Sequence, residues 1–153
     1  MRRKNALREH CVAPFVNAST PPQGDAWKPL ANYISTITDS TDEEVETEGF
    51  YDGDGTPESR VTTIALAYDV EGFYNPADPA QQFIADMKLK TGDGRRCWHR
   101  VVSSDGTRTW IGHATVSSIV AGSGAATEDE EFSCTIAYNH IPVETITQAV
   151  PTP

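Results

Sequence analysis

Gly72-Phe-Tyr-Asn-Pro-Ala-Asp-Pro79 is the stretch of sequence that decides the fold, because a β-patterned segment ends there and a single short helix begins. Residues 60–71, directly before it, alternate in polarity and are rich in β-branched side chains, which predicts a strand. Beyond residue 90 the pattern is again that of strands and turns. The first expectation about the fold is therefore one helix placed between two β blocks.

The helix is predicted over about residues 78–90. Asp78 is a suitable N-cap, and Pro79 fits the first helical position because the N–H that it lacks has no partner there in any helix. Gln81 is expected largely on the faces that point away from the sheet. The apolar stripe that packs the helix against a sheet is expected to consist of Phe83, Ile84 and Met87.

Six strands are expected around this helix, over residues 32–38, 44–51, 61–70, 95–103, 107–120 and 131–139. Ser104-Asp-Gly106 lies between two alternating runs, and Asp-Gly in that position is the strongest short-range signal of a hairpin. Both ends of the chain contain several prolines and lack periodicity. Three parts are therefore predicted, namely an extended N-terminal arm (1–30), a β domain (31–140) and a C-terminal extension (141–153).

The charge is strongly negative and unevenly distributed. Twelve Lys and Arg against twenty-two Asp and Glu give a formal net charge of −10, which argues against a protein that grips nucleic-acid phosphates through basic patches. Residues 31–59 contain no Lys or Arg, and an acidic loop is expected over residues 39–58. A solvated loop and a surface matched by a basic partner are both open interpretations of this segment.

Two smaller charge patterns lie inside this distribution. The first ten residues are net positive through Arg2, Arg3, Lys4 and Arg8. Within the acidic segment, one face of the expected strand carries a row of carboxylates, and such a face must lie in water or in a wet channel. That row consists of Glu44, Glu46 and Glu48.

No catalytic signature is present, so no enzyme activity, metal site or cofactor is expected. Cys97 and His99 share one face of a strand, but no zinc-ligand spacing surrounds them. Core or interface anchoring is the commoner use of tryptophan, although Trp27, Trp98 and Trp110 also allow a sugar-stacking platform. The three cysteines have no CxxC spacing and no apolar stretch is long enough to span a bilayer, so we expect folding in a reducing cytoplasm and no membrane partner.

Several motifs follow one another along residues 27–142, and none of them is catalytic. They are Trp27, Gly49-Phe-Tyr-Asp-Gly53 after the acidic run, Arg60 to Thr63, Asp78-Pro-Ala-Gln-Gln82, Gly106, Gly112-His-Ala-Thr-Val116, Phe132-Ser-Cys-Thr-Ile136 and Pro142. In order and spacing the chain resembles the major tail tube protein of phages with long, non-contractile tails (siphoviruses). Asn139-His-Ile-Pro142 departs from the pattern, since relatives often have a glycine turn there.

The resemblance implies a mainly β fold of two packed antiparallel sheets, as a β-sandwich or small barrel, with the one flanking helix and extended arms at both ends. It also implies a structural virion protein in which six copies form a ring, the inner sheets join into a continuous barrel, and rings stack into the tube through which DNA leaves the capsid. The implied partners are other copies of the chain, the tail terminator, the baseplate or tail tip, the tape-measure protein and DNA in transit. The implied location is the virion tail, with the host cytoplasm during assembly.

The resemblance assigns ring-to-ring contacts to the two ends of the chain and to the acidic loop. Candidate inter-ring residues are Arg2, Arg3, Lys4, Arg8, Asp42, Glu43, Asp52 and Asp54. The row of Glu44, Glu46 and Glu48 is the candidate lumen-facing surface, since a negative lumen repels phosphate and lets DNA slide. Two other interpretations stay open, namely a tail terminator or head–tail connector that stops at one ring, and a β-sandwich carbohydrate-binding module.

Overall fold

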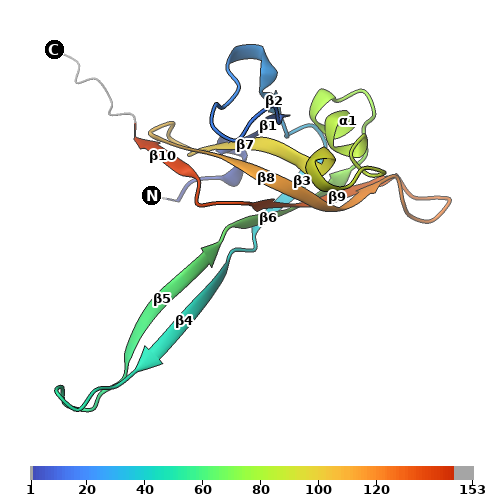
Figure 1. Ribbon diagram of the computed structural model, residues 1–153. Coiled ribbons are helices and arrows are strands. Elements are labelled where there is room, and N and C mark those ends of the chain that lie inside the picture. Colours follow the sequence, from blue (N-terminus) through green and yellow to red (C-terminus); the bar gives the residue numbers. More distant parts are fainter. Residues whose placement is uncertain (1, 147–153) are drawn as a thin grey trace.

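The computed structural model describes residues 2–146 and, as predicted, is mainly β with one α-helix and two antiparallel sheets (Figure 1). The strands are β1 (Glu9–Pro14), β2 (Lys28–Pro29), β3 (Ile34–Asp39), β4 (Asp42–Glu48), β5 (Glu58–Ala65), β6 (Ala67–Phe73), β7 (Arg96–Val102), β8 (Arg108–Ala121), β9 (Glu131–Tyr138) and β10 (Val143–Ile146). The helix is α1 (Pro79–Ala85), and three short 3-10 helices are η1 (Asn5–Leu7), η2 (Gly24–Ala26) and η3 (Gly92–Arg95). Residues 147–153 of the predicted C-terminal extension lie outside the described residues.

Eight strands form the larger sheet, in the order β2-β1-β7-β8-β9-β6-β3, with β10 paired to the first part of β8. The predicted hairpin at Ser104-Asp-Gly106 joins β7 to β8, and the Asp105 carboxylate accepts hydrogen bonds from the hydroxyls of Ser103 and Thr107, both at 2.7 Å. The strand predicted over 61–70 is two strands instead. β5 and β6 belong to different sheets, and the Leu66 carbonyl between them accepts a hydrogen bond from the Tyr138 N–H at 2.8 Å.

Part of the predicted N-terminal arm belongs to the larger sheet, which corrects the expectation for residues 1–30. β1 pairs with β7 along its whole length, and Cys11, Val12 and Ala13 are buried. Pro14, which has no N–H to give to a ladder, occupies the last position of the strand. Burial of three consecutive side chains therefore outweighs the high proline content that suggested an arm.

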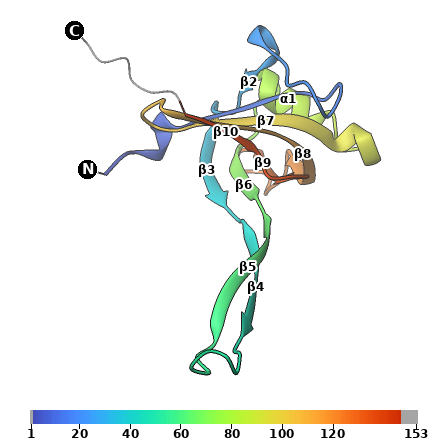
Figure 2. The same cartoon turned by 60° about the vertical axis from the view of Figure 1, so that its left-hand side comes forward.

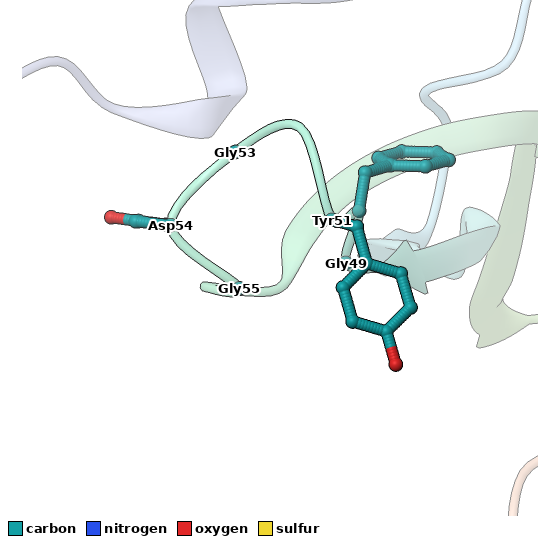
Figure 3. Close-up of a pocket in the computed structure, with 6 residues that line it drawn as sticks. Gly49, Tyr51, Gly53, Asp54 and Gly55 are labelled. Atoms are coloured by element: carbon teal, nitrogen blue, oxygen red, sulfur yellow. The ribbon is translucent and has the colours of Figure 1, made fainter.

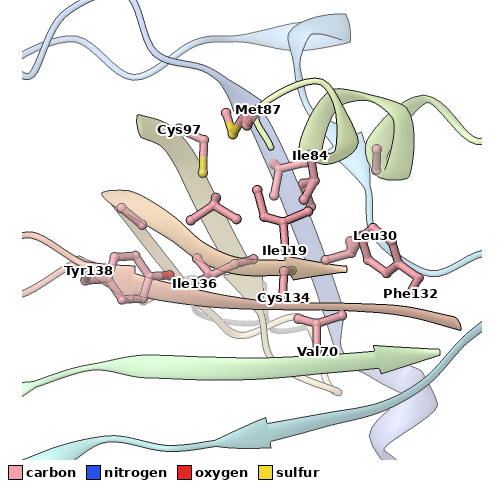
Figure 4. Packing of buried hydrophobic residues seen from close by; sticks show 14 residues of the cluster. Leu30, Val70, Ile84, Met87, Cys97, Ile119, Phe132, Cys134, Ile136 and Tyr138 are labelled. Carbon is pink, nitrogen blue, oxygen red and sulfur yellow. The ribbon is translucent and has the colours of Figure 1, made fainter. Parts of the chain in front are cut away.

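The main core lies inside the curl of the larger sheet, and α1 covers its open side (Figure 4). Side chains from β1, β6, β7, β8 and β9 meet there, with Phe132 and Ile136 among the most completely buried. Ile84 and Met87 of the helix are buried in the same core, while Phe83 packs at its margin with the Lys28 Nζ 4.8 Å from the ring. Burial of each large apolar side chain is worth roughly 2 kcal/mol, so this stripe holds the helix in place.

The helix begins where the sequence predicts and ends earlier. The Asp78 carboxylate accepts a hydrogen bond from the Gln81 N–H at 3.2 Å, and Pro79 is the first helical residue. After Ala85 the chain continues through i→i+3 hydrogen bonds as far as Lys90. The expected helix over 78–90 is thus corrected to seven helical residues followed by turns, a tightening that is common where the last carbonyls of a helix lack partners.

Gln81 was expected away from the sheet, and it is fully buried instead. Its side-chain Nε2 donates to the carbonyls of Asn32 at 2.8 Å and Phe73 at 3.0 Å. Its Oε1 accepts from the Asn75 N–H at 2.6 Å. This one amide therefore ties α1 to the segment before β3 and to the end of β6, and a side chain that could not pair with these groups would leave buried backbone atoms without partners.

At Gly72 the backbone of β3 lies too close to β6 to leave room for a side chain. A Cβ on this residue would lie 2.2 Å from the Tyr33 carbonyl oxygen and 2.8 Å from the Ile34 Cα. Both are backbone atoms, so no side-chain movement relieves the overlap. The ladder between the two strands also shifts register between Ile34 and Thr36, and only glycine fits beside that irregularity.

We predict that Gly72→Ala lowers the free energy of unfolding by about 1–3 kcal/mol, because β3 must move away from β6 to admit the methyl group. Urea denaturation of the purified chain measures the change. Gly53→Ala is the matched control, since a Cβ there would lie 3.7 Å from the Phe50 carbonyl oxygen, an ordinary contact. Equal stability of the two variants would contradict the close approach at Gly72.

His10 of β1 and His99 of β7 lie within a group of aromatic rings, where His99 is fully buried and His10 is partly buried. The His10 and His99 ring centroids are 5.6 Å apart, and His99 Nδ1 is 2.5 Å from the Tyr138 hydroxyl. Burial, with a smaller contribution from the Arg8 charge, lowers the pKa of His10 to about 4. Burial and the nearby His10 lower the pKa of His99 to about 3. Both imidazoles are therefore neutral at physiological pH, whereas in the unfolded chain they titrate near 6.5.

The stability that these histidines provide is present above about pH 6.5 and is lost as the pH falls toward 4, because only the unfolded chain takes up their protons over that range. We predict a loss on the order of 2 kcal/mol from His10 alone over this range, measured by urea denaturation at several pH values. His10→Gln should reduce the dependence without abolishing it, because His99 is still protonated only in the unfolded chain over this range. A dependence as steep in His10→Gln as in the original chain would refute this origin.

Candidate assembly surface

The β4–β5 hairpin is a separate two-stranded sheet that projects away from the rest of the molecule (Figures 1 and 2). Its pairing runs from Asp42 opposite Ala65 to Glu48 opposite Glu58, with one register shift after Glu44. Every residue of both strands is exposed. An isolated two-stranded hairpin is marginally stable in water, so this element is suited to packing against another surface.

The two faces of the hairpin differ in chemistry. The face that carries the predicted row of Glu44, Glu46 and Glu48 also carries Asp42 and Glu58, and its one cation is Arg60, which pairs with Glu46 at 2.9 Å. The opposite face carries Val45 directly across from Val61, with Ile64 beyond them, and these apolar side chains are exposed. One face therefore suits water or a wet channel, and the other suits contact with protein.

The tip of the hairpin, residues 49–55, presents two aromatic rings and two carboxylates to solvent. Tyr51 is fully exposed and Phe50 is more than half exposed. The Asp54 carboxylate accepts a hydrogen bond from the Thr56 N–H at 2.8 Å, which lowers the pKa of Asp54. Figure 3 shows the Tyr51 and Asp54 side chains pointing away from the loop in different directions. The tip is thus a preformed loop with an exposed apolar side chain beside fixed negative charge.

The predicted inter-ring residues are four carboxylates and four cations, and the structure does not bring the two groups together. The carboxylates belong to the hairpin, with Asp42 and Glu43 at its base and Asp52 and Asp54 at its tip. The cations near the N-terminus have other partners, since Arg3 pairs with Asp105 at 2.8 Å and Arg8 lies over the Trp110 ring at 5.8 Å. Arg2 and Lys4 are exposed. Within residues 2–146 none of these four cations contacts a hairpin carboxylate.

The larger sheet also has a polar face, which the sequence analysis did not predict. It lies opposite the core, and the Thr135 hydroxyl donates to the Asp69 carboxylate across it at 2.9 Å. The residues on this face are Thr36, Thr38, Asp69, Glu71, Thr115, Ser117, Ser133 and Thr135. The sequence does contain a signal for this face, because its polar residues alternate with Val70, Cys134 and Ile136, which are buried.

The side chains considered for catalysis or metal binding are buried or committed elsewhere. Burial raises the pKa of the thiols of Cys97 and Cys134 to about 12, which holds them in the unreactive protonated form. Trp27 and Trp98 are buried in a second core cluster, so they offer no exposed platform for a sugar. In the described part of the chain no group of three or more His, Cys, Asp or Glu is placed to hold a metal, and no helix is long and apolar enough to cross a membrane.

Comparison with protein-family models and with curated proteins gives no match, whereas comparison with solved structures does. A chain from the tail of an empty GTA particle with C6 symmetry matches with a TM-score of 0.69 at 13% identity, covering 96% of this chain and 100% of that chain. The anti-feeding prophage cap, which terminates the AFP tube, matches with a TM-score of 0.56 at 14% identity over 96% of this chain and 93% of that chain.

A third match is a chain of the PVC sheath–tube complex, from an extracellular contractile injection system in its extended state. Its TM-score is 0.51 at 14% identity, over 90% of this chain and 88% of that chain. The chain shares its fold with components of tail and tube assemblies. At these identities the likeness is one of fold, and it extends over nearly the full length of each protein.

Because the hairpin is exposed on both faces, we predict that it can be removed without unfolding the larger sheet. Replacing residues 42–65 by Asn-Gly gives a two-residue turn between Thr41 and Leu66 and preserves the pairing of β3 with β6. The free energy of unfolding should change by less than about 1 kcal/mol, as for other changes at exposed positions. Thermal and urea unfolding measure it, and loss of cooperative unfolding would show that the hairpin is part of the core structure.

Proposed function

We propose that the chain is a structural subunit of a phage-type tail tube, in which six copies form a ring and the rings stack around a channel that DNA passes through. The observation that carries the proposal is the match, over nearly the full length of both proteins, to a chain in a tail with C6 symmetry. The proposal places the protein in the virion tail and gives it no enzymatic role. Its other partners would be the terminator, the tail tip or baseplate and the tape-measure protein.

The open edges of the larger sheet support ring formation. β3 ends this sheet on one side, and its outer edge has no partner strand within the described residues. An exposed edge of this kind invites uncontrolled pairing with other chains. A closed ring in which β3 pairs with the neighbouring copy removes that hazard and joins six sheets into one wall.

The polar surfaces support a channel that DNA does not adhere to. The polar face of the larger sheet combines Thr and Ser hydroxyls with the carboxylates of Asp69 and Glu71. The hairpin adds the row of Glu44, Glu46 and Glu48, with Arg60 as its one cation. We assign these two faces to the lumen, where negative charge repels DNA phosphates and lets the duplex slide.

The proposal covers tail tubes in general and not one type of tail. One of the similar structures belongs to an extracellular contractile injection system. The structural matches therefore support a tail tube without favouring the non-contractile type that the sequence resembles. A second candidate function is a ring that ends the tube, which the match to the AFP tube-terminating cap favours. The two functions differ in whether the rings of this chain stack on one another.

Ring-to-ring contacts are assigned to the ends of the chain and to the hairpin. The residues proposed for them are Arg2, Arg3, Lys4, Arg8, Asp42, Glu43, Asp52 and Asp54. Of these, Arg3 would have to exchange Asp105 for a partner in the next ring, and because their pair is exposed the exchange has little cost.

Analytical ultracentrifugation of the full chain over a range of concentrations tests the proposal. The expected species are rings of about 100 kDa, six times the subunit mass of 16.7 kDa, and stacks of such rings. The variant in which Asn-Gly replaces residues 42–65 is the control, and it should form single rings without stacks because the larger sheet and its edges remain. A chain that stays monomeric at every concentration would contradict the proposal, and single rings alone would favour the terminator.

A further inference from the structure

The hairpin tip is an incomplete surface, and a complementary surface exists elsewhere on the same chain. The tip combines the exposed rings of Phe50 and Tyr51 with the carboxylates of Asp52 and Asp54. A fitting partner would present an exposed apolar side chain between cations that have no other partner. The twelve Lys and Arg of the chain can be sorted by that requirement.

Eight of the cations already have partners within the described residues. Arg3, Arg60, Arg96, Arg100 and Arg108 each pair with a carboxylate. Arg8 and Lys28 lie over aromatic rings, and Arg95 donates to backbone carbonyls. In residues 2–146 the cations left without an ion pair or a ring are Arg2, Lys4, Lys88 and Lys90.

The turn formed by Lys88, Leu89 and Lys90 combines both features that the tip requires. The Leu89 side chain is 95% exposed, the most exposed aliphatic side chain among the described residues, and a free lysine stands on each side of it. An apolar side chain in that position loses hydration without any compensating contact inside the chain. The turn therefore offers an apolar anchor and two positive charges to match the aromatic rings and the carboxylates of the tip.

Arg95 holds this turn in a fixed conformation. Its Nη2 donates to the Lys88 carbonyl at 2.6 Å, and its Nε donates to the Lys90 carbonyl at 2.8 Å. Its Nη1 donates to the Val116 carbonyl of β8 at 3.3 Å, which ties the turn to the larger sheet. A surface that is rigid before binding loses less conformational entropy on binding, so this clamp favours docking at Leu89.

The tip and the turn cannot meet within one molecule. The hairpin extends from one side of the molecule, and the turn that follows α1 lies on the other side, in both views (Figures 1 and 2). A contact between them must join two copies, and because the two surfaces differ it is a head-to-tail contact, which either closes into a ring or repeats along a stack.

We propose that the tip of one copy, residues 50–54, docks on the Lys88–Lys90 turn of a second copy. Leu89 packs against Phe50 and Tyr51 at the centre of the contact. The ammonium groups of Lys88 and Lys90 pair with the carboxylates of Asp52 and Asp54 around it. The inference rests on the proposed function, since it names the surface that receives the hairpin when one ring is placed on another.

Cross-linking with a short bismaleimide tests this contact in the full chain. Gly53→Cys protein is mixed with Thr91→Cys protein, so that Phe50, Tyr51 and Leu89 remain in place while both thiols are exposed beside the proposed contact. The native cysteines do not interfere because Cys11, Cys97 and Cys134 are buried. The matched control is a mixture of Gly53→Cys with Thr127→Cys, at an exposed residue of the loop between β8 and β9. We expect about tenfold more cross-linked dimer from the Thr91 mixture, because docking raises the local thiol concentration.

A charge exchange tests the ion pairs. Lys88→Glu with Lys90→Glu should reduce the cross-link about tenfold, and Asp52→Lys with Asp54→Lys in the partner should restore it, because the attraction then runs the other way. Lys28→Glu with Arg108→Glu makes the same change in net charge at two cations outside the proposed contacts between copies, and it should have no such effect. Equal cross-linking in the Thr127 mixture, or no restoration by the exchange, would overturn the proposal.

The outcomes for the contact and for the proposed function are separable. Rings and stacks that form without a cross-link between positions 53 and 91 would remove this contact and leave the tail-tube proposal standing. A specific cross-link in a chain that never forms rings would keep the contact and remove the tube.

Discussion

The larger sheet buries the main core on one of its faces only, and the rest of the structure depends on this constraint. The larger sheet curls around a single core, and α1 closes the open side through Ile84 and Met87. The Gln81 amide and the close approach at Gly72 fix where the helix and β3 lie relative to β6. Because one helix is sufficient to cover the core, the opposite face of the sheet, its β3 edge and the whole hairpin are left uncovered, and these are the surfaces available for assembly.

The uncovered surfaces are divided by chemistry in a way that suits a tube. The polar face of the sheet and the row of Glu44, Glu46 and Glu48 favour water, whereas Val45, Val61 and Ile64 favour contact with protein. Segregated charge at the two ends of the molecule, with carboxylates at the hairpin tip and free lysines beside Leu89, gives the subunit a direction. A subunit with two different ends that repeats head to tail can build a stack without limit. Closure of the sheet edges restricts each layer of that stack to a ring.

Local signals in the sequence were sufficient for much of this structure. Asp78 and Pro79 marked the start of α1, Asp105-Gly106 marked the β7–β8 hairpin, and alternation placed the three glutamates of β4 on one face. What was missed depends on contacts between distant segments. Gln81 is buried because carbonyls of β6 and of the segment before β3 surround it, and β1 joins the sheet because β7 lies beside it. At the break between β5 and β6 the Leu66 carbonyl bonds to the Tyr138 N–H, far along the chain, and no local sequence pattern indicates this contact.

The central claim is that identical copies of this chain close into six-membered rings around a channel. Electron microscopy of the concentrated full-length protein, with classification of end-on views, measures it most directly. We predict rings with six-fold symmetry and an open centre, and side views in which the rings stack with a constant repeat. Rings with another symmetry, or particles without a central channel, would contradict the account.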